Sequence, residues 1–150
     1  MYHAIPSEQL RRELLKEKTD LYNTLYLFGD PEKTIALIAR LRTDMTNRKP
    51  ATMVRHITGT AFREDVITRC HRGDISNIKR DYQGDMLILE GLEYVAGREA
   101  TEEKLYGILD WYLENGKRII VTGDGALDQL TRLAPRIHAQ LSGGISLRVA

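Results

Sequence analysis

A chain of 150 residues has the length of one compact domain with its own core. Its 42% hydrophobic and 29% charged residues are typical of a globular protein, and its formal net charge of +1 does not by itself indicate a nucleic-acid binder. No apolar run approaches the roughly 20 residues of a membrane span, and the single Cys70 cannot form an internal disulfide. These features predict a cytoplasmic protein without a membrane partner.

Hydrophobic periodicity and turn residues predict alternating helices and strands along the chain. A polar helix over 7–18, with Ser7 as its N-cap, is followed by a strand at 25–28. The pattern then predicts a helix over 32–45, a strand over 53–57, and two helices over 60–70 and 74–82. The remaining elements are a strand over 86–89, a helix over 101–115, and strands over 118–122 and 145–149.

The strand at 86–89 is the clearest of these elements. Its sequence Met-Leu-Ile-Leu has no polar residue, which indicates burial on both faces, as in a parallel sheet. Strands that alternate with helices predict an α/β sandwich. We expect residues 1–21 to form an N-terminal helix and lead-in, and residues 22–150 to form one core.

Four sequence blocks resemble one known family. Residues 22–29 are similar to the segment that leads into a Walker A loop, and residues 87–99 (LILEGLEYVAGRE) resemble the family's Walker B run and the following loop. Residues 119–124 look like the strand that ends in sensor 1, and residues 133–141 resemble the arginine-finger segment. In this order the blocks resemble the AAA+ core of the DnaA-type replication initiators. The resemblance implies a three-layer α/β/α P-loop fold with five parallel strands in the order 5-1-4-3-2, here without the family's lid or DNA-binding domain.

The phosphate loop departs from the family's GxxGxGK[ST] pattern. Only three residues separate Gly29 from Lys33 and Thr34, so the loop is two residues too short and lacks its inner glycines. Pro31 has no N–H to donate, and the carboxylates of Asp30 and Glu32 would repel a triphosphate. The same three residues suit the start of a helix: Asp30 as N-cap, Pro31 at the first position, and Glu32 in the first turn.

The catalytic positions have changed as well. The resemblance places Glu90 at the first Walker B acid, but Gly91 replaces the second and cannot act as a base. We expect Glu90 to be a solvated carboxylate at the end of its strand, and Glu93 to point elsewhere. Asp124 matches the sensor 1 loop, while Gln140 stands where the arginine finger would be. The sequence therefore predicts a pseudo-ATPase with no catalytic residue and no metal site, in which ATP and Mg²⁺ bind weakly or not at all.

Residues 60–82 occupy the place of the family's initiator-specific insertion, which lines a channel for single-stranded DNA. Its basic residues, together with the arginine after Gly97, form a possible phosphate-contacting patch. The patch comprises Arg63, Arg69, Arg72, Lys79, Arg80 and Arg98. Acidic residues in the same segment, including Asp65 and Asp81, favour a mixed-charge solvated surface instead.

We therefore expect a non-catalytic interaction or regulatory factor in the initiation of DNA replication, with DnaA or another replication AAA+ protein as partner. One alternative is a module that binds single-stranded DNA weakly. The other is an ATP-binding AAA+ protein with an unusual P-loop.

Overall fold

The computed structural model describes residues 3–15 and 23–150. Within these residues, six parallel strands form one central sheet. The strands are β1 (His3–Ile5), β2 (Thr24–Gly29), β3 (Val54–Thr58), β4 (Met86–Glu90), β5 (Arg118–Gly123) and β6 (Ile145–Val149). Their order is β1-β6-β2-β5-β4-β3, and every neighbouring pair is parallel.

The prediction of a five-stranded sheet was wrong in strand number and in the complete order. An additional strand, β1, pairs with β6 at the edge of the sheet, with Ala4 opposite Arg148. The five expected strands are β2 to β6, and among themselves they follow the order β6-β2-β5-β4-β3. A strand of three residues is too short for its side-chain alternation to be recognised, so the sequence pattern missed it.

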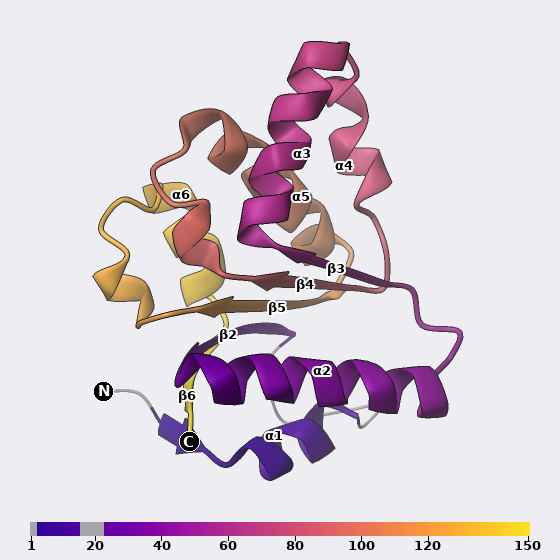
Figure 1. Cartoon of the computed structure of the whole chain (residues 1–150), viewed down its shortest axis with the longest axis vertical. Helices are drawn as coiled ribbons and strands as arrows, with labels where there is room; N and C mark the ends of the chain where they lie inside the picture. Colours follow the sequence, from indigo (N-terminus) through magenta and orange to yellow (C-terminus); the bar gives the residue numbers. More distant parts are fainter. Residues whose placement is uncertain (1–2, 16–22) are drawn as a thin grey trace.

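Helices cover both faces of the sheet. They are α1 (Ser7–Leu14), α2 (Pro31–Arg48), α3 (Gly59–Arg72), α4 (Ile78–Asp81), α5 (Glu99–Glu114) and α6 (Pro135–Ser142). Short 3₁₀ turns are η1 (Ile75–Asn77), η2 (Leu92–Tyr94) and η3 (Leu127–Gln129). Figure 1 shows α1 and α2 on one face and α3 to α6 on the other, which confirms a three-layer α/β/α arrangement.

Two helix predictions need correction. The N-cap of α1 is Pro6 rather than Ser7, because Pro6 is extended (φ −62°, ψ 138°) and Ser7 already lies in the helix. The predicted helix over 74–82 divides into η1 and α4. The predicted end of the first helix at Lys18 and the proposed boundary between 21 and 22 lie outside the described residues.

The two faces of β4 belong to two separate hydrophobic clusters. Met86 and Ile88 pack with residues of α1 and α2, whereas Leu87 and Leu89 pack with residues of α3, α5 and α6. All four side chains are at most 4% exposed. The predicted burial of this strand on both faces is therefore confirmed. No helix within residues 3–15 and 23–150 is long and apolar enough to cross a bilayer.

Candidate functional site

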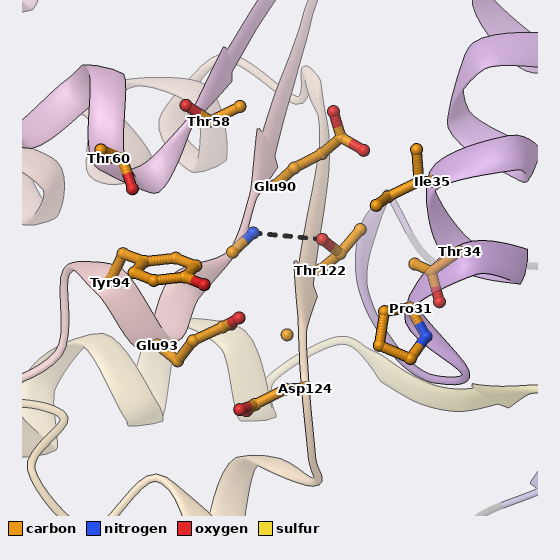
Figure 2. A pocket seen from close by; sticks show the side chains of 12 residues that line it. Pro31, Thr34, Ile35, Thr58, Thr60, Glu90, Glu93, Tyr94, Thr122 and Asp124 are labelled. Atoms are coloured by element: carbon orange, nitrogen blue, oxygen red, sulfur yellow. Dashed lines mark hydrogen bonds between the residues drawn. The ribbon is translucent and has the colours of Figure 1, made fainter.

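A hollow of about 620 Å³ lies at the carboxyl ends of β3, β4 and β5, beside the first turn of α2 (Figure 2). This edge of a parallel α/β sheet is where such folds commonly bind ligands. The charged residues that line the hollow are Glu90, Glu93 and Asp124, and no lysine or arginine of the described chain lines it. The hollow is therefore acidic.

The start of α2 has the capped form that its sequence predicts. Asp30 is the N-cap, and its Oδ1 accepts a hydrogen bond from the backbone N–H of Glu32 at 2.9 Å. Pro31 begins the helix. Both the N–H of Thr34, at 3.0 Å, and its hydroxyl, at 2.9 Å, donate to the carbonyl of Asp30. These groups are satisfied within the first turn of the helix, so they do not form an open cradle of N–H donors.

Gly29 and Lys33 do not line the hollow. The exposed Lys33 lies with residues of α1, among them Glu8 and Arg11, around a smaller depression on another side of α2. Gly29 has φ 133°, and a Cβ at this position would lie 2.8 Å from the carbonyl oxygen of Val149. This glycine therefore permits close contact with β6. Of the five predicted site residues, Thr34, Glu90 and Asp124 line the hollow.

Glu90 is not the solvated carboxylate that the sequence suggested. Its side chain is 18% exposed, and its Oε2 lies at hydrogen-bond distance, 2.6 Å, from His56 Nε2. His56 lies on β3, the neighbour of β4, where Thr58 is opposite Glu90. The sequence gives no indication of this contact, because it depends on the pairing register of two strands 34 residues apart.

Gly91 leaves no room for the missing acid. It has φ 88°, and a Cβ there would lie 2.9 Å from Cδ2 of the Tyr94 ring. The N–H of Gly91 donates to the carbonyl of Thr122 at 3.1 Å and to its hydroxyl at 3.2 Å (Figure 2). A Cβ at Gly59 would lie only 2.2 Å from the Gly91 carbonyl oxygen. This tightly packed turn suits glycine, and it provides no carboxylate at this position.

The prediction that Glu93 points elsewhere was wrong. The 3₁₀ turn η2 brings it into the same hollow as Glu90 and Asp124 (Figure 2). Its Oε1 is buried and has no hydrogen-bond partner among the described residues. Burial raises the pKa of Glu93, and the negative charge of Asp124 raises it further, although the backbone N–H groups of Glu93 and Asp124 act in the opposite direction.

The side chain of Gln140 packs within its own domain. Its Nε2 donates to the carbonyl of Tyr106 on α5 at 3.1 Å, and its Oε1 is buried without a hydrogen-bond partner among the described residues. Arg136, one turn earlier on α6, lies 4.4 Å from the centroid of the Tyr106 ring, in a cation–π contact. Both side chains are therefore used in packing α6 against α5.

Half of the predicted DNA-contacting residues are already paired with carboxylates. Arg69 is 13% exposed and binds Asp65 at 3.0 Å and Asp81 at 2.7 Å, which raises its pKa. The exposed Arg72 pairs with Asp74 at 3.0 Å, and Arg80 pairs with Asp81 at 3.3 Å. Arg69 therefore joins α3 to α4, and the predicted contact of these residues with DNA stays a prediction.

Arg63, Lys79 and Arg98 differ from this group, because their side chains form no ion pair within the described residues. Lys79 lies exposed on α4, whereas Arg63 and Arg98 line a second hollow next to the first. Among the residues that the structure describes, no cluster of three or more potential metal ligands occurs.

The fold and the place of the hollow define a domain of the P-loop, AAA+-like class. The chain belongs to the bacterial DnaA ATPase domain family, which it matches over residues 8–148.

Individual relatives agree with this assignment. The chromosomal replication initiator protein DnaA of Acinetobacter baumannii (strain ATCC 17978) is 27% identical over 150 residues, covering 98% of this chain and 32% of the relative. AMPPCP-bound DnaA from Aquifex aeolicus has a TM-score of 0.84 at 20% identity, over 95% of this chain and 44% of that one. The replication initiator DnaA bound to AMPPCP and single-stranded DNA has a TM-score of 0.81 at 20% identity, over 93% of this chain and 44% of that one. The structural likeness concerns the fold, and the chain spans about a third of the length of the curated relative.

Proposed function

We propose that this chain acts in the initiation of DNA replication as a DnaA-family protein that does not bind or hydrolyse ATP. Its role is to associate with a DnaA initiator or another AAA+ protein of replication, in the cytoplasm. Membership of the bacterial DnaA ATPase domain family supports a role in replication initiation. The altered residues of the hollow support the loss of ATP binding and hydrolysis.

The observation that carries this proposal is the closed start of α2. A P-loop binds phosphate through several backbone N–H groups and a lysine. Here Asp30 accepts the N–H of Glu32, Pro31 has none, and the N–H of Thr34 is bonded within the turn. Losing these donors, with Lys33 on another side of α2, is expected to reduce affinity for a triphosphate by several kcal/mol, on the order of 10³-fold.

The residues of the hollow do not fit Mg²⁺–ATP either. A triphosphate placed beside Glu90, Glu93 and Asp124 would face three carboxylates and no lining lysine or arginine of the described chain. Glu90 would also have to leave His56 to approach a metal ion. Gly91 supplies no base for a water molecule. The chain's own groups therefore oppose each requirement of ATP turnover.

Calorimetric titration of the purified chain with ATP and with ADP, each with Mg²⁺, tests this part of the proposal. We expect no saturable binding at micromolar nucleotide and no phosphate release. A micromolar dissociation constant that Arg98→Ala leaves unchanged would instead support an ATP-binding protein with an unusual P-loop, because Arg98 does not line the hollow beside α2.

The interaction role is supported by the exposed apolar side chains at the mouth of the hollow. Ile35 is 60% exposed and Tyr94 is 56% exposed, and both line it. Exposed large apolar residues that gather at one place are typical of protein contact surfaces. Since Gln140 and Arg136 are engaged with Tyr106, an ATP-driven assembly of identical copies is not expected.

The experiment is to mix the chain with the DnaA initiator of the same organism, and to follow assembly by size-exclusion chromatography with light scattering. We expect co-elution, with or without ATP, that Ile35→Ser weakens. Met53→Ser is the matched control, because Met53 is 53% exposed but lies away from the hollow. Absence of co-elution, or equal weakening by both variants, would contradict the proposed partner surface.

Weak binding of single-stranded DNA is a second candidate function, favoured by the cations that have no ion-pair partner. Lys79 and Arg98 are exposed and uncompensated within the described residues, although the net charge of the chain is only +1. Binding through so few phosphate contacts would be weak and lost at moderate salt. Fluorescence anisotropy of a labelled oligothymidine at several salt concentrations measures this DNA binding. Nanomolar affinity at physiological salt would mean that DNA binding, and not association with an initiator, is the main function.

A further inference from the structure

The second hollow, of about 390 Å³, has three arginines from three separate segments of the chain in its lining. Arg63 comes from the first turns of α3, Arg98 immediately precedes α5, and Arg132 lies in the loop before α6. We call this the arginine hollow. It adjoins the acidic hollow, because Glu93 and Tyr94 line both.

The three guanidinium groups form no ion pair or hydrogen bond within the described residues. Other arginines nearby are compensated: Arg69 and Arg72 each pair with a carboxylate. Three guanidinium groups that line one concavity without a bonded carboxylate create a positive potential there, which favours the binding of an anion.

We propose that the arginine hollow binds a compact polyphosphate, meaning a small ligand with two or more adjacent phosphate groups. Guanidinium groups bind phosphate through paired N–H donors, and three of them match a multiply charged anion better than a single phosphate. The site is distinct from the one in which the family's P-loop would bind ATP, since it is built from α3, the start of α5 and the loop before α6.

The packing of Arg132 indicates that its side chain is held in place within the arginine hollow. A Cβ at Gly97 (φ 82°) would lie 3.2 Å from Arg132 Cβ and 3.3 Å from its Cδ, so the stem of Arg132 lies directly against this glycine. The contact directs the arginine to the segment that carries Arg98. The carboxyl group of Glu93 is the opposing charge in the lining, and burial, aided by the charge of Asp124, raises its pKa. A raised pKa makes it easier for Glu93 to accept a proton when an anion binds nearby.

A compact ligand is favoured over a nucleic-acid strand by the neighbouring charges. A strand needs cations spaced along a track, because each phosphate follows the previous one at intervals of several ångströms. Beyond the arginine hollow, however, Arg69, Arg72 and Arg80 are already bound by aspartates. Of the cations in and around this segment that form no ion pair within the described residues, Arg63, Arg98 and Arg132 line one hollow, whereas Lys79 does not, and this grouping suits a small polyanion.

The test is calorimetric titration of the whole chain with sodium pyrophosphate at low salt, without Mg²⁺, phosphate or sulfate in the buffer. We expect saturable binding with one site per chain. Arg98→Ala and Arg132→Ala should each weaken it about tenfold, the order expected for a lost charge-assisted contact. Both residues are exposed, so these variants should fold, and circular dichroism checks this. Arg48→Ala is the matched control, because Arg48 is an exposed arginine at the end of α2.

A parallel titration with oligothymidine distinguishes a small ligand from a strand. Pyrophosphate binding that depends on Arg98 and Arg132 but not on Arg48 supports the proposal. The proposal is overturned if pyrophosphate shows no saturable binding, or if Arg48→Ala weakens it equally, which would indicate only general attraction. It is also overturned if the oligonucleotide binds and pyrophosphate does not. None of these outcomes depends on whether the acidic hollow binds ATP.

Discussion

The capped start of α2 can be tested by removing the cap itself. In Asp30→Ala the Oδ1 acceptor of the Glu32 N–H is lost, together with a negative charge at the positive end of an 18-residue helix. Because Asp30 is exposed, no cavity is created, and the change in stability should come from the cap and the charge alone.

The expected loss follows from these two contributions. An N-cap replaced by alanine costs about 1 kcal/mol, and an exposed charge near a helix terminus contributes about 0.3–1 kcal/mol. Asp30→Ala should therefore lower the free energy of unfolding by about 1–2 kcal/mol. Asp30→Asn keeps an acceptor without the charge, so it should lose less than about 1 kcal/mol. For a chain of 150 residues, each kcal/mol corresponds to roughly 2–4 °C in Tm.

Urea denaturation and thermal melting of the two variants measure these differences. Glu64→Ala, which removes an exposed carboxylate within α3, is the control and should change stability by less than about 0.5 kcal/mol. If Asp30→Ala is as stable as the unaltered chain, or if it acquires micromolar affinity for ATP, the interpretation of this segment as a closed helix start is refuted.

Three further predictions concern the interior and the acidic hollow. Tyr112→Phe removes the hydroxyl that donates to the carbonyl of Tyr82 at 2.5 Å, so urea denaturation should show a loss of about 1–3 kcal/mol. The pKa of Glu93 is raised above its ordinary 4.5, so its carboxyl group favours the folded state when protonated, and this contribution is lost as the pH rises through the folded pKa. Glu93→Gln should therefore stabilise the chain at pH 7, with a gain that shrinks toward pH 4.5; no gain would contradict the burial. Gly91→Glu must adopt φ 88° against the ring of Tyr94, and should cost at least about 1–2 kcal/mol without producing phosphate release.

Local features were predictable from sequence alone. The order Asp30-Pro31-Glu32 specifies a helix start through residues that are adjacent in the chain, and the structure has this cap. The apolar run of β4 likewise predicts burial on both faces from its own residues alone, and these residues are buried. The resemblance to DnaA, which four blocks between residues 22 and 141 indicate, was confirmed by the family match over residues 8–148.

Features that depend on distant residues were not predictable. The contact of Glu90 with His56 requires the register between β4 and β3, and the inward orientation of Gln140 requires the packing of α6 on α5. Glu93 enters the hollow only because a 3₁₀ turn follows the left-handed Gly91. The sequence does not predict a site at Arg132, because the other two arginines of the hollow are 34 or more positions away in the chain.

The pairing of β1 with β6 has a consequence for how the sheet is completed during synthesis. β1 contacts no strand near it in sequence; its hydrogen-bonded neighbour is β6, and the N–H of Ala150 donates to the carbonyl of Ile5. During synthesis, His3–Ile5 can therefore pair only after residues 145–149 have emerged from the ribosome. Contacts of such long sequence separation form late and slow the folding of a domain. We therefore expect β1 to join the sheet later than strands whose partners lie closer in the sequence.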